Sequence, residues 1–396
     1  MSTLKVDAIR HNSATSDAIT THSDGTASAK IIDVGGGQLS HRNLVINGAM
    51  MLAQRGTSST SSGYQTVDRF QTIVSGVDEA ITQAQVDITA GTTPYTLGFR
   101  KAYKITNGNQ TSGLGAADRL ETIHNIEAQD IANSGWNYLS TSSYITLQFW
   151  IKSSVAQNFY GRLLTSSGTD YNYPFETGSL SANTWTKITK TIPGNSGITV
   201  DNTTGHGLRI SLYLGLGTDY TGSVSLNTWA AYNSAARVPD ITSTWYTTND
   251  ATLEITGVQL EVGNTATSFE HRTFGDELLR CQRYCMKWWN NGDTTSNHSR
   301  FPPGYYQNTT SGVFFLFHSV PMRQTDGRTL THNVGVIENM SGGGNGNNLS
   351  IMADGGSSMI TPIILSGMSG VTQHAIFVPR IGSGQTNWYI IVSSEL

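Results

Sequence analysis

Strict alternation of apolar and other residues over long stretches is the feature that most restricts the fold of this chain. The stretch Leu208–Leu216 (LRISLYLGL) has an apolar side chain at every second position, and Leu253–Val262 (LEITGVQLEV) does so on both sides of Gly257. A period of two puts these side chains on one face of a β-strand. Tyr144–Lys152 and Trp185–Ile192 alternate as well. Because no helix–strand alternation is present, the pattern predicts an antiparallel β-sandwich, and the break at Gly257 predicts a β-bulge.

The composition favours the same all-β class. Charged residues make up 13% of the chain, whereas about 25% is usual. Its polarity comes from Ser, Thr, Asn and 42 Gly. Disordered chains combine high charge with few aromatic residues, and this chain has 9% aromatic residues. Short strands joined by glycine-rich turns are therefore expected.

Charge and hydropathy exclude several classes of partner. The net charge is −4, from 24 basic and 28 acidic residues, and no basic run occurs. Nucleic-acid binding is not expected, because it depends on clustered positive charge. The longest apolar stretch, Val313–Phe317, is far shorter than a membrane span, and Met1–Arg10 has no apolar core of a secretory signal. We expect neither membrane insertion nor secretion by such a signal.

The sequence divides into four predicted parts. Residues 1–42 hold isolated apolar positions in Ser/Thr-rich sequence and end near Gly35–Gly37, so they cannot form a core of their own. They are either a flexible tail or a segment that a partner protein or further copies of the chain must order. Residues 43–272 form the predicted sandwich, 273–289 a connecting helix, and 290–396 a second, smaller β domain.

The helix is predicted over Phe274–Trp289, with Asp276 and Glu277 near its start. An apolar stripe at spacings of three, four and three residues follows its length. This stripe either packs on its own sandwich or forms a helical junction of three chains. The two cysteines of the chain lie in it four residues apart, and we expect free thiols buried in a protein that folds in a reducing compartment. The stripe consists of Leu278, Cys281, Cys285 and Trp288.

The distal part, residues 290–396, carries further strand-like runs. A glycine-rich stretch, Ser341–Asn348, predicts a mobile surface loop between two of them. The predicted strands are Val313–Val320, Val334–Glu338, Ile360–Leu365, His374–Val378 and Trp388–Val392.

Three blocks of the sequence resemble a recurring module of bacteriophage tail-fibre and related virion proteins. They are Asn43–Thr57 (NLVINGAMMLAQRGT), Val67–Phe70 (VDRF) and Ile255–Tyr284 (ITGVQLEVGNTATSFEHRTFGDELLRCQRY). The third block is the most specific. The blocks bracket residues 43–284, more than half of the chain, whereas residues 290–396 match nothing in that family.

The resemblance implies a jelly-roll sandwich similar to non-catalytic carbohydrate-binding modules. It also implies a homotrimer that projects from the virion tail and is assembled in the host cytoplasm. Residues 1–42 would attach to other tail proteins, and the distal domain would touch the host. Trimer closure would cover exposed sheet edges and multiply weak binding sites.

A search for catalytic motifs finds none with adequate spacing. There is no HExxH, zinc, P-loop or GxSxG pattern, and no cofactor is predicted. A glycoside hydrolase needs two carboxylates across a cleft, and the sequence cannot pair those available. A structural calcium site using Asn47, Asp68 and Glu261 is a further hypothesis, which no motif supports.

Binding surfaces have better support in the sequence, because a neutral sugar needs exposed aromatic rings beside amide or carboxylate groups. Three aromatic clusters lie in turn-like or distal sequence. Each is either a glycan contact or ordinary core packing. We therefore predict a non-enzymatic adhesin that binds a host glycan or receptor, against the alternatives of a virion-bound polysaccharide depolymerase and a structural spacer. The candidate residues are Tyr171, Tyr173, Tyr305, Tyr306, Asn308, Trp388 and Tyr389.

Overall fold

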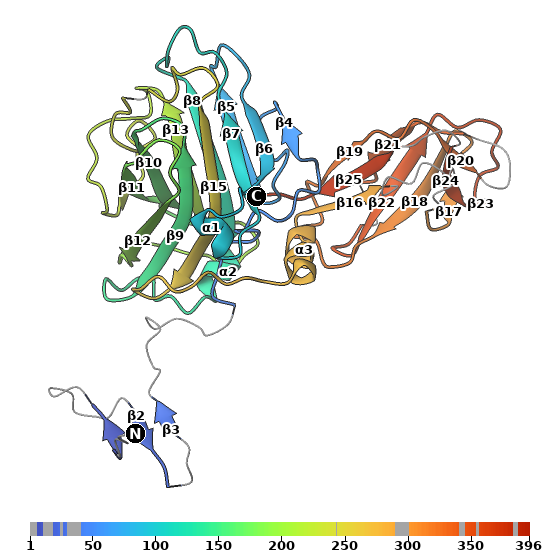
Figure 1. Cartoon of the computed structure of the whole chain (residues 1–396). Helices are drawn as coiled ribbons and strands as arrows, with labels where there is room; N and C mark the ends of the chain where they lie inside the picture. Colours follow the sequence, from blue (N-terminus) through green and yellow to red (C-terminus); the bar gives the residue numbers. More distant parts are fainter. Residues whose placement is uncertain are drawn as a thin grey trace.

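The computed structural model describes residues 6–10, 19–23, 27–29, 41–242, 244–289, 301–339, 345–353, 356–382 and 387–396. Figure 1 shows a large β-sandwich joined to a slimmer β body, with a small N-terminal sheet apart from both. Helix α1 (Thr93–Thr96) and helix α2 (Ala128–Ala132) are short segments of the sandwich. The described part thus confirms the all-β fold class.

The sandwich consists of two six-stranded antiparallel sheets. Sheet I has the order β12-β9-β15-β7-β6-β4, and sheet II has the order β14-β11-β10-β13-β8-β5. Successive strands change repeatedly from one sheet to the other, as in a jelly roll. The strands are β4 (Ser58–Ser59), β5 (Phe70–Ser75), β6 (Thr82–Asp87), β7 (Lys101–Thr106), β8 (Arg119–Glu127), β9 (Tyr144–Ser153), β10 (Asn158–Thr165), β11 (Tyr171–Ser179), β12 (Thr186–Pro193), β13 (His206–Leu216), β14 (Ala230–Ala231) and β15 (Thr252–Val262).

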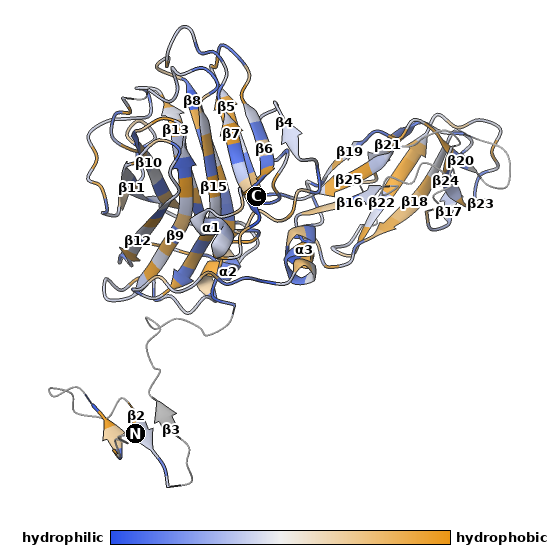
Figure 2. Cartoon of the chain, in the orientation of Figure 1, coloured by the Kyte–Doolittle hydropathy of each residue, from blue (hydrophilic) through white to orange (hydrophobic). Residues whose placement is uncertain are grey.

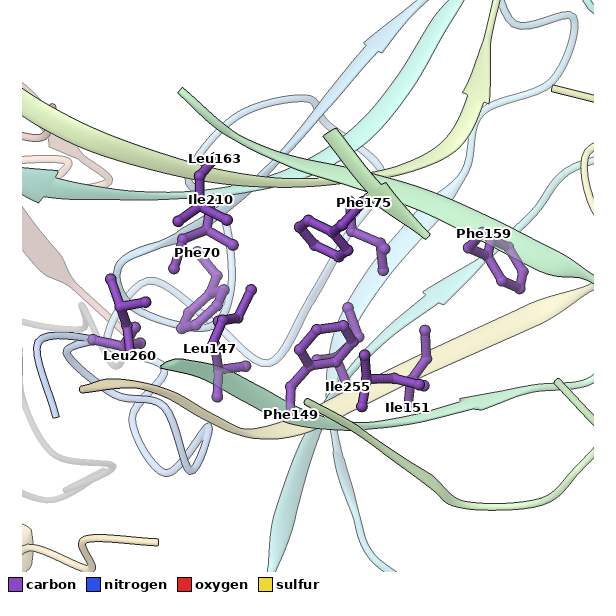
Figure 3. Packing of buried hydrophobic residues seen from close by; sticks show 14 of the residues in the cluster. Phe70, Leu147, Phe149, Ile151, Phe159, Leu163, Phe175, Ile210, Ile255 and Leu260 are labelled. Atoms are coloured by element: carbon purple, nitrogen blue, oxygen red, sulfur yellow. The ribbon is translucent and has the colours of Figure 1, made fainter. Parts of the chain in front are cut away.

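Alternating side chains fill the space between the two sheets. Figure 2 shows the alternation of hydropathy along the strands, and Figure 3 shows Leu147 and Phe149 of sheet I facing Leu163 and Phe175 of sheet II. The Phe149 and Phe175 ring centroids are 6.5 Å apart. Each fully buried side chain of this size contributes about 1.5–3 kcal/mol relative to an exposed one. This shared core holds the two sheets together.

The long alternating stretches form the strands that the sequence predicts, β9, β12, β13 and β15. The predicted bulge is confirmed as well, since the register between β15 and β9 shifts between Thr256 and Gln259. Gly257 has a φ of 62°, in the left-handed region. A Cβ atom there would lie 2.7 Å from the ring of Phe99. The position therefore requires glycine on two grounds.

The predicted helix is too long. Helix α3 spans Phe274–Gln282, and Cys285–Trp289 forms strand β16, which pairs with β25 (Tyr389–Ser393). Thr273 begins the helix by accepting a hydrogen bond from the Asp276 backbone N–H at 3.2 Å. The pairing with a strand about 100 residues later ends the helical geometry, because a strand needs an extended backbone.

The predicted apolar stripe is consequently not one helix face, which corrects the hypothesis of a three-chain junction along it. Cys281 lies in the helix and packs on Ile46 and Leu52 of its own sandwich. Cys285 and Trp288 belong to strand β16, and Trp288 packs against the distal core. Leu278 is half-buried beside Cys281. Both thiols are free and buried, and burial raises their pKa.

The described residues of the distal body form three small sheets, with the orders β16-β25-β19, β21-β22-β18-β17-β23 and β20-β24. Every predicted distal strand overlaps an observed one, although two of these, β20 and β23, are very short. Part of the predicted loop 341–348, residues 341–344, lies outside the described residues. The remaining strands are β17 (Gly304–Tyr306), β18 (Ser311–Phe317), β19 (Thr329–His332), β20 (Ile337–Asn339), β21 (Asn348–Ile351), β22 (Ile360–Ser366), β23 (Ile376–Phe377) and β24 (Pro379–Ile381).

The N-terminal sheet is built from β1 (Ala8–Ile9), β2 (Ile19–Thr21) and β3 (Ala27–Ala29). Val6 and Ile9 are exposed there by 39% and 53%. Within its described residues this sheet therefore lacks a core, as the sequence predicts. Residues 30–40, which include the predicted joint at Gly35–Gly37, lie outside the described part.

Candidate functional site

The distal body is fixed to the sandwich by buried charges. The chain following β25 lies against the sandwich, where Glu395 forms ion pairs with Arg55, at 3.0 Å, and with Arg69. The guanidinium carbon of the fully buried Arg69 is 3.4 Å from the centroid of the Tyr284 ring. Cation–π contacts are stronger when they are shielded from water. These contacts form the first half of a rigid junction between the two bodies.

Glu127, at the end of β8, forms the other half. Its carboxylate accepts hydrogen bonds from Arg283 Nε at 2.7 Å, Arg283 Nη2 at 2.8 Å and the Tyr284 hydroxyl at 2.5 Å. Burial alone would raise the pKa of Glu127, but the hydrogen bonds from Arg283 and Tyr284 bring it below its ordinary value. A bidentate arginine contact also fixes orientation. The geometry holds the two bodies at one relative position.

A groove with a volume of 560 Å³ lies beside this junction. One wall comes from residues 55–65 of the sandwich, and the other comes from strands β19 and β25 of the distal body. Its lining is mostly hydroxyl, amide and aromatic side chains. We call it the junction groove; it is lined by Arg55, Gly56, Ser58, Ser59, Tyr64, Gln65, Gly327, Thr329, Thr331, Tyr389, Ile391, Ser393 and Glu395.

Internal contacts hold the lining of the junction groove in place. The Tyr64 hydroxyl donates to the backbone oxygen of Leu396 at 2.9 Å, which fixes the ring. Arg55 Nη2 donates to the Ser393 hydroxyl at 2.8 Å and to Glu395 Oε1 at 3.0 Å. Such preorganisation lowers the entropy cost of binding a ligand.

An aromatic surface continues the groove along the distal sheet. Trp289 of β16 lies directly opposite Tyr389 of β25, so both rings project from the same face. Trp289 is 50% exposed. Lys287 Nζ lies 5.8 Å from the Trp289 ring and 5.3 Å from the Tyr389 ring. We call Lys287, Trp289 and Tyr389 the aromatic platform.

The groove and platform together carry the groups that a sugar requires. Aromatic faces accept the C–H faces of a pyranose ring, and hydroxyl, amide and charged groups pair with its hydroxyls. Glu395 is the one carboxylate in the described lining, and two arginines already hold it. Hydrolysis of a glycosidic bond commonly uses two carboxylates. This arrangement suits binding better than bond cleavage.

The structure separates the predicted glycan-binding residues. Tyr389 lines the junction groove, and Tyr305 and Asn308 are exposed on the distal body. Asn308 Oδ1 accepts a hydrogen bond from the Thr310 backbone N–H at 2.8 Å. Tyr171 is half-buried against the sandwich core. The structure does not bring these four residues together into one site.

The other three predicted contacts are wrong, because their side chains are buried. Tyr173 packs on Trp229 in the sandwich, with ring centroids 5.2 Å apart. Tyr306 stacks on Phe377 at 4.7 Å, and Trp388 lies in the distal core. These three side chains pack in the cores of the two bodies, as the alternative of ordinary core packing predicts.

Sequence reasoning missed Arg55, Tyr64 and Glu395. Arg55 and Glu395 meet although they lie 340 residues apart in the chain. Nothing in the local pattern around either residue signals this contact. The contact forms only because the end of the distal body folds back against the sandwich.

The hypothetical calcium ligands do not form a common site. Asn47 Nδ2 donates to the Asp68 backbone oxygen at 2.9 Å, and Gln54 Nε2 donates to the Asp68 carboxylate at 2.8 Å. Glu261 instead accepts hydrogen bonds from Thr267. Within the described ranges, no group of three or more His, Cys, Asp or Glu is arranged to hold a metal ion. The helices described there are also too short or too polar to cross a membrane.

Comparison with known proteins gives no family assignment. No family model matches the chain, and no curated protein sequence matches it. Among solved structures, the enzymatically active domain of bacteriophage CBA120 tailspike protein 4 aligns with 56% of this chain at 11% identity and a TM-score of 0.30. This chain covers only 21% of that tailspike structure.

Two further matches are carbohydrate-binding modules. For a CBM4 structure, the alignment spans 55% of this chain and 99% of the CBM4 chain, at 12% identity and a TM-score of 0.28. For a xylan-binding domain from CBM 22, the alignment also spans 55% of this chain and 99% of the other, at 8% identity and a TM-score of 0.27. At such TM-scores the assignment of the jelly roll rests on the strand order of the chain itself.

Proposed function

We propose that this protein is a phage tail fibre that attaches to a host-surface glycan by reversible, non-catalytic binding. The junction groove with its aromatic platform carries the proposal. It combines exposed rings, fixed hydroxyl and amide groups, and a volume of 560 Å³ that accommodates a short saccharide. The resemblance of residues 43–284 to tail-fibre proteins supports the assignment to the virion.

Multivalency completes the proposed mechanism. The N-terminal sheet exposes Val6 and Ile9 and has no core among its described residues, which is compatible with a partner that covers it. In the proposed fibre, residues 1–42 attach to other tail proteins, and three copies of the chain form a homotrimer. Three weak sites on one particle bind far more tightly than one, because the later contacts form at high effective concentration. No cofactor and no covalent step is required.

The test uses the full-length protein and polysaccharide purified from the envelopes of candidate bacterial hosts. Trp289→Ala and Tyr389→Ala each remove one ring of the platform. We expect each to weaken binding about tenfold, which corresponds to about 1.4 kcal/mol. Phe317→Ala is the matched control, because Phe317 is 55% exposed on the distal body but lies outside the groove lining. Its binding should equal that of the wild type.

The same incubation separates the alternative functions. Binding without release of reducing ends supports the adhesin, whereas release of reducing ends would establish a depolymerase. Unchanged binding in both platform variants would refute the proposed site. Light scattering should give a mass near three chains, and a monomer would contradict the trimer and its avidity together.

A further inference from the structure

The aromatic platform carries a positive charge that has no carboxylate partner. Lys287 is half-buried, and its Nζ lies 5.8 Å from the centroid of the Trp289 ring and 5.3 Å from that of the Tyr389 ring. Cation–π contacts extend to about 6 Å, so both of these contacts are near the limit and weak. Within the described part of the chain, Lys287 forms no ion pair. Its ammonium group is therefore available to a further partner.

Another lysine beside a tryptophan shows how such a contact is completed elsewhere in the molecule. Lys152 Nζ, on the sandwich, lies 5.1 Å from the centroid of the Trp185 ring. It also forms an ion pair with Glu254 at 3.0 Å. The protein itself supplies the anion there, whereas at the platform the place of the anion is left to a ligand.

The strand register places Lys287 beside the junction groove. Lys287 of β16 lies directly opposite Ile391 of β25, and Ile391 lies directly opposite Thr331 of β19. Residues opposite one another share a face of the sheet, and neighbouring strands are about 4.8 Å apart. Ile391 and Thr331 both line the groove, whereas Ile390 and Val392 enter the distal core from the other face. A ligand in the groove is thus one strand away from Lys287.

The acidic side chains of this part of the molecule already have partners. Glu395 is held by two arginines. Asp68 is buried and accepts hydrogen bonds from the backbone N–H of Gln54 at 3.0 Å and from its Nε2 at 2.8 Å. Burial lowers the pKa of Lys287, and the negative charge of Asp68 offsets this effect only in part. An anion bound at the platform would stabilise the charged form of the lysine.

We propose that the platform selects glycans whose sugar carries an anionic group, either a carboxylate or a phosphate. This inference rests on the function proposed above and names the class of glycan. The sugar ring stacks on Trp289 or Tyr389, its hydroxyls contact the groove, and its anionic group pairs with Lys287 Nζ. A lysine is a point charge on a flexible stem, so it can pair with either anion. Neutral glycans of the same size bind more weakly.

The test uses the full-length protein and the envelope polysaccharide that it binds, in three forms. One form is untreated, one has its carboxylates reduced with carbodiimide and borohydride, and one has its phosphates removed with hydrogen fluoride. Lys287→Met should weaken binding of the untreated form about fivefold, which is near the upper end for a partly exposed ion pair. The same variant should bind the form that lacks the recognised anion as well as the wild type does. The form on which the effect disappears identifies that anion.

Two further variants control for the loss of the side chain itself. Lys287→Arg keeps the charge and should retain most of the binding. Lys152→Met also removes a lysine beside a tryptophan ring, but outside the groove lining, and should bind as the wild type does. The wild type should bind the form without the anion about fivefold more weakly than the untreated form, a measurement that depends on no substitution. In 1 M salt this difference should shrink, because the charges are then screened within about 3 Å.

The outcomes separate this inference from the proposed function. Trp289→Ala should weaken binding of all three forms, since ring stacking does not depend on the charge of the sugar. If it does so while Lys287→Met acts equally on all forms or on none, the selection of anionic glycans is overturned and the groove remains the binding site. A bound polysaccharide that contains neither carboxylate nor phosphate would overturn it as well. If Trp289→Ala changes nothing, the groove itself is refuted, and this inference falls with it.

Discussion

Replacing His318 by glutamine should remove a large part of the acid sensitivity of the distal body. His318 is buried, and its Nε2 lies 2.8 Å from the Thr361 hydroxyl oxygen. That oxygen already accepts a hydrogen bond from Arg328 Nη1 at 2.5 Å. The Thr361 hydroxyl can therefore donate to a neutral imidazole but cannot accept well from a protonated one. Burial, aided by the charge of Arg328, lowers the pKa of His318 from 6.5 to about 4.

The sign and size of the effect follow from this pKa. The unfolded chain takes up a proton on His318 below pH 6.5, while the folded protein resists protonation until about pH 4. The stability that neutral His318 contributes is thus fully present above pH 6.5 and is lost as the pH falls. At 1.36 kcal/mol per pKa unit, the loss reaches about 2.5 kcal/mol at a pH of about 4.5.

Urea unfolding followed by tryptophan fluorescence measures this loss. The Trp288 ring is 5.7 Å from the His318 ring, so its emission reports on this region. Glutamine keeps a polar group that can reach Thr361 and does not titrate. The free energy of unfolding of the wild type minus that of His318→Gln should fall by about 2.5 kcal/mol between a pH of about 7.5 and about 4.5. A difference that stays constant over this range would refute the reasoning.

Two further substitutions test the fold and the junction. Gly257→Ala should destabilise the sandwich by about 1–3 kcal/mol in urea unfolding, since it adds strain and a close contact with Phe99. Gly56→Ala, where an added Cβ meets nothing within 4 Å, is its control and should stay near the wild type. Tyr284→Phe removes the hydroxyl that donates to Glu127 and should cost about 1–3 kcal/mol. Hydrogen exchange should also rise in the chain following β25, and unchanged protection there would contradict the role assigned to this junction.

The sequence predicts the long strands well because their pattern is local. In β13 the apolar positions alternate from Leu208 to Leu216, and in β15 they alternate on both sides of Gly257, so that one face of each strand enters the core. The alternation alone determines which face that is. Gly257 was also recognisable, since the apolar pattern changes register there. These features depend on neighbours in the sequence, so the sequence alone reveals them.

The end of helix α3 could not be predicted in the same way. The spacing from Leu278 to Trp288 fits a helix, and the residues Cys285–Trp289 continue that spacing. Their partner strand β25 lies about 100 residues later, and all five of its residues pair with β16. A contact at that separation leaves no trace in a local pattern. Tertiary pairing overrode the local preference for helix.

Neighbouring aromatic residues show a different limit, which strand geometry explains. Tyr305 and Tyr306 are consecutive, and the first is exposed while the second is buried. Trp388 lies in the distal core, whereas its neighbour Tyr389 lines the groove. Successive residues of a strand point to opposite faces, so one ring of each pair had to enter the core. The sequence marks the pair, and only the fold decides which ring is available to a ligand.

The position of the junction groove would link the proposed adhesion to the stability of the whole chain. One wall belongs to the sandwich and the other to the distal body, so the groove exists only while the junction is closed. The buried contacts of Glu127 and Glu395 close it in the absence of ligand. Because the groove is preformed, ligand binding carries no free-energy cost for bringing the two bodies together. In the proposed fibre, the same contacts would transmit force from a bound glycan into the sandwich core, which a flexible linker could not do.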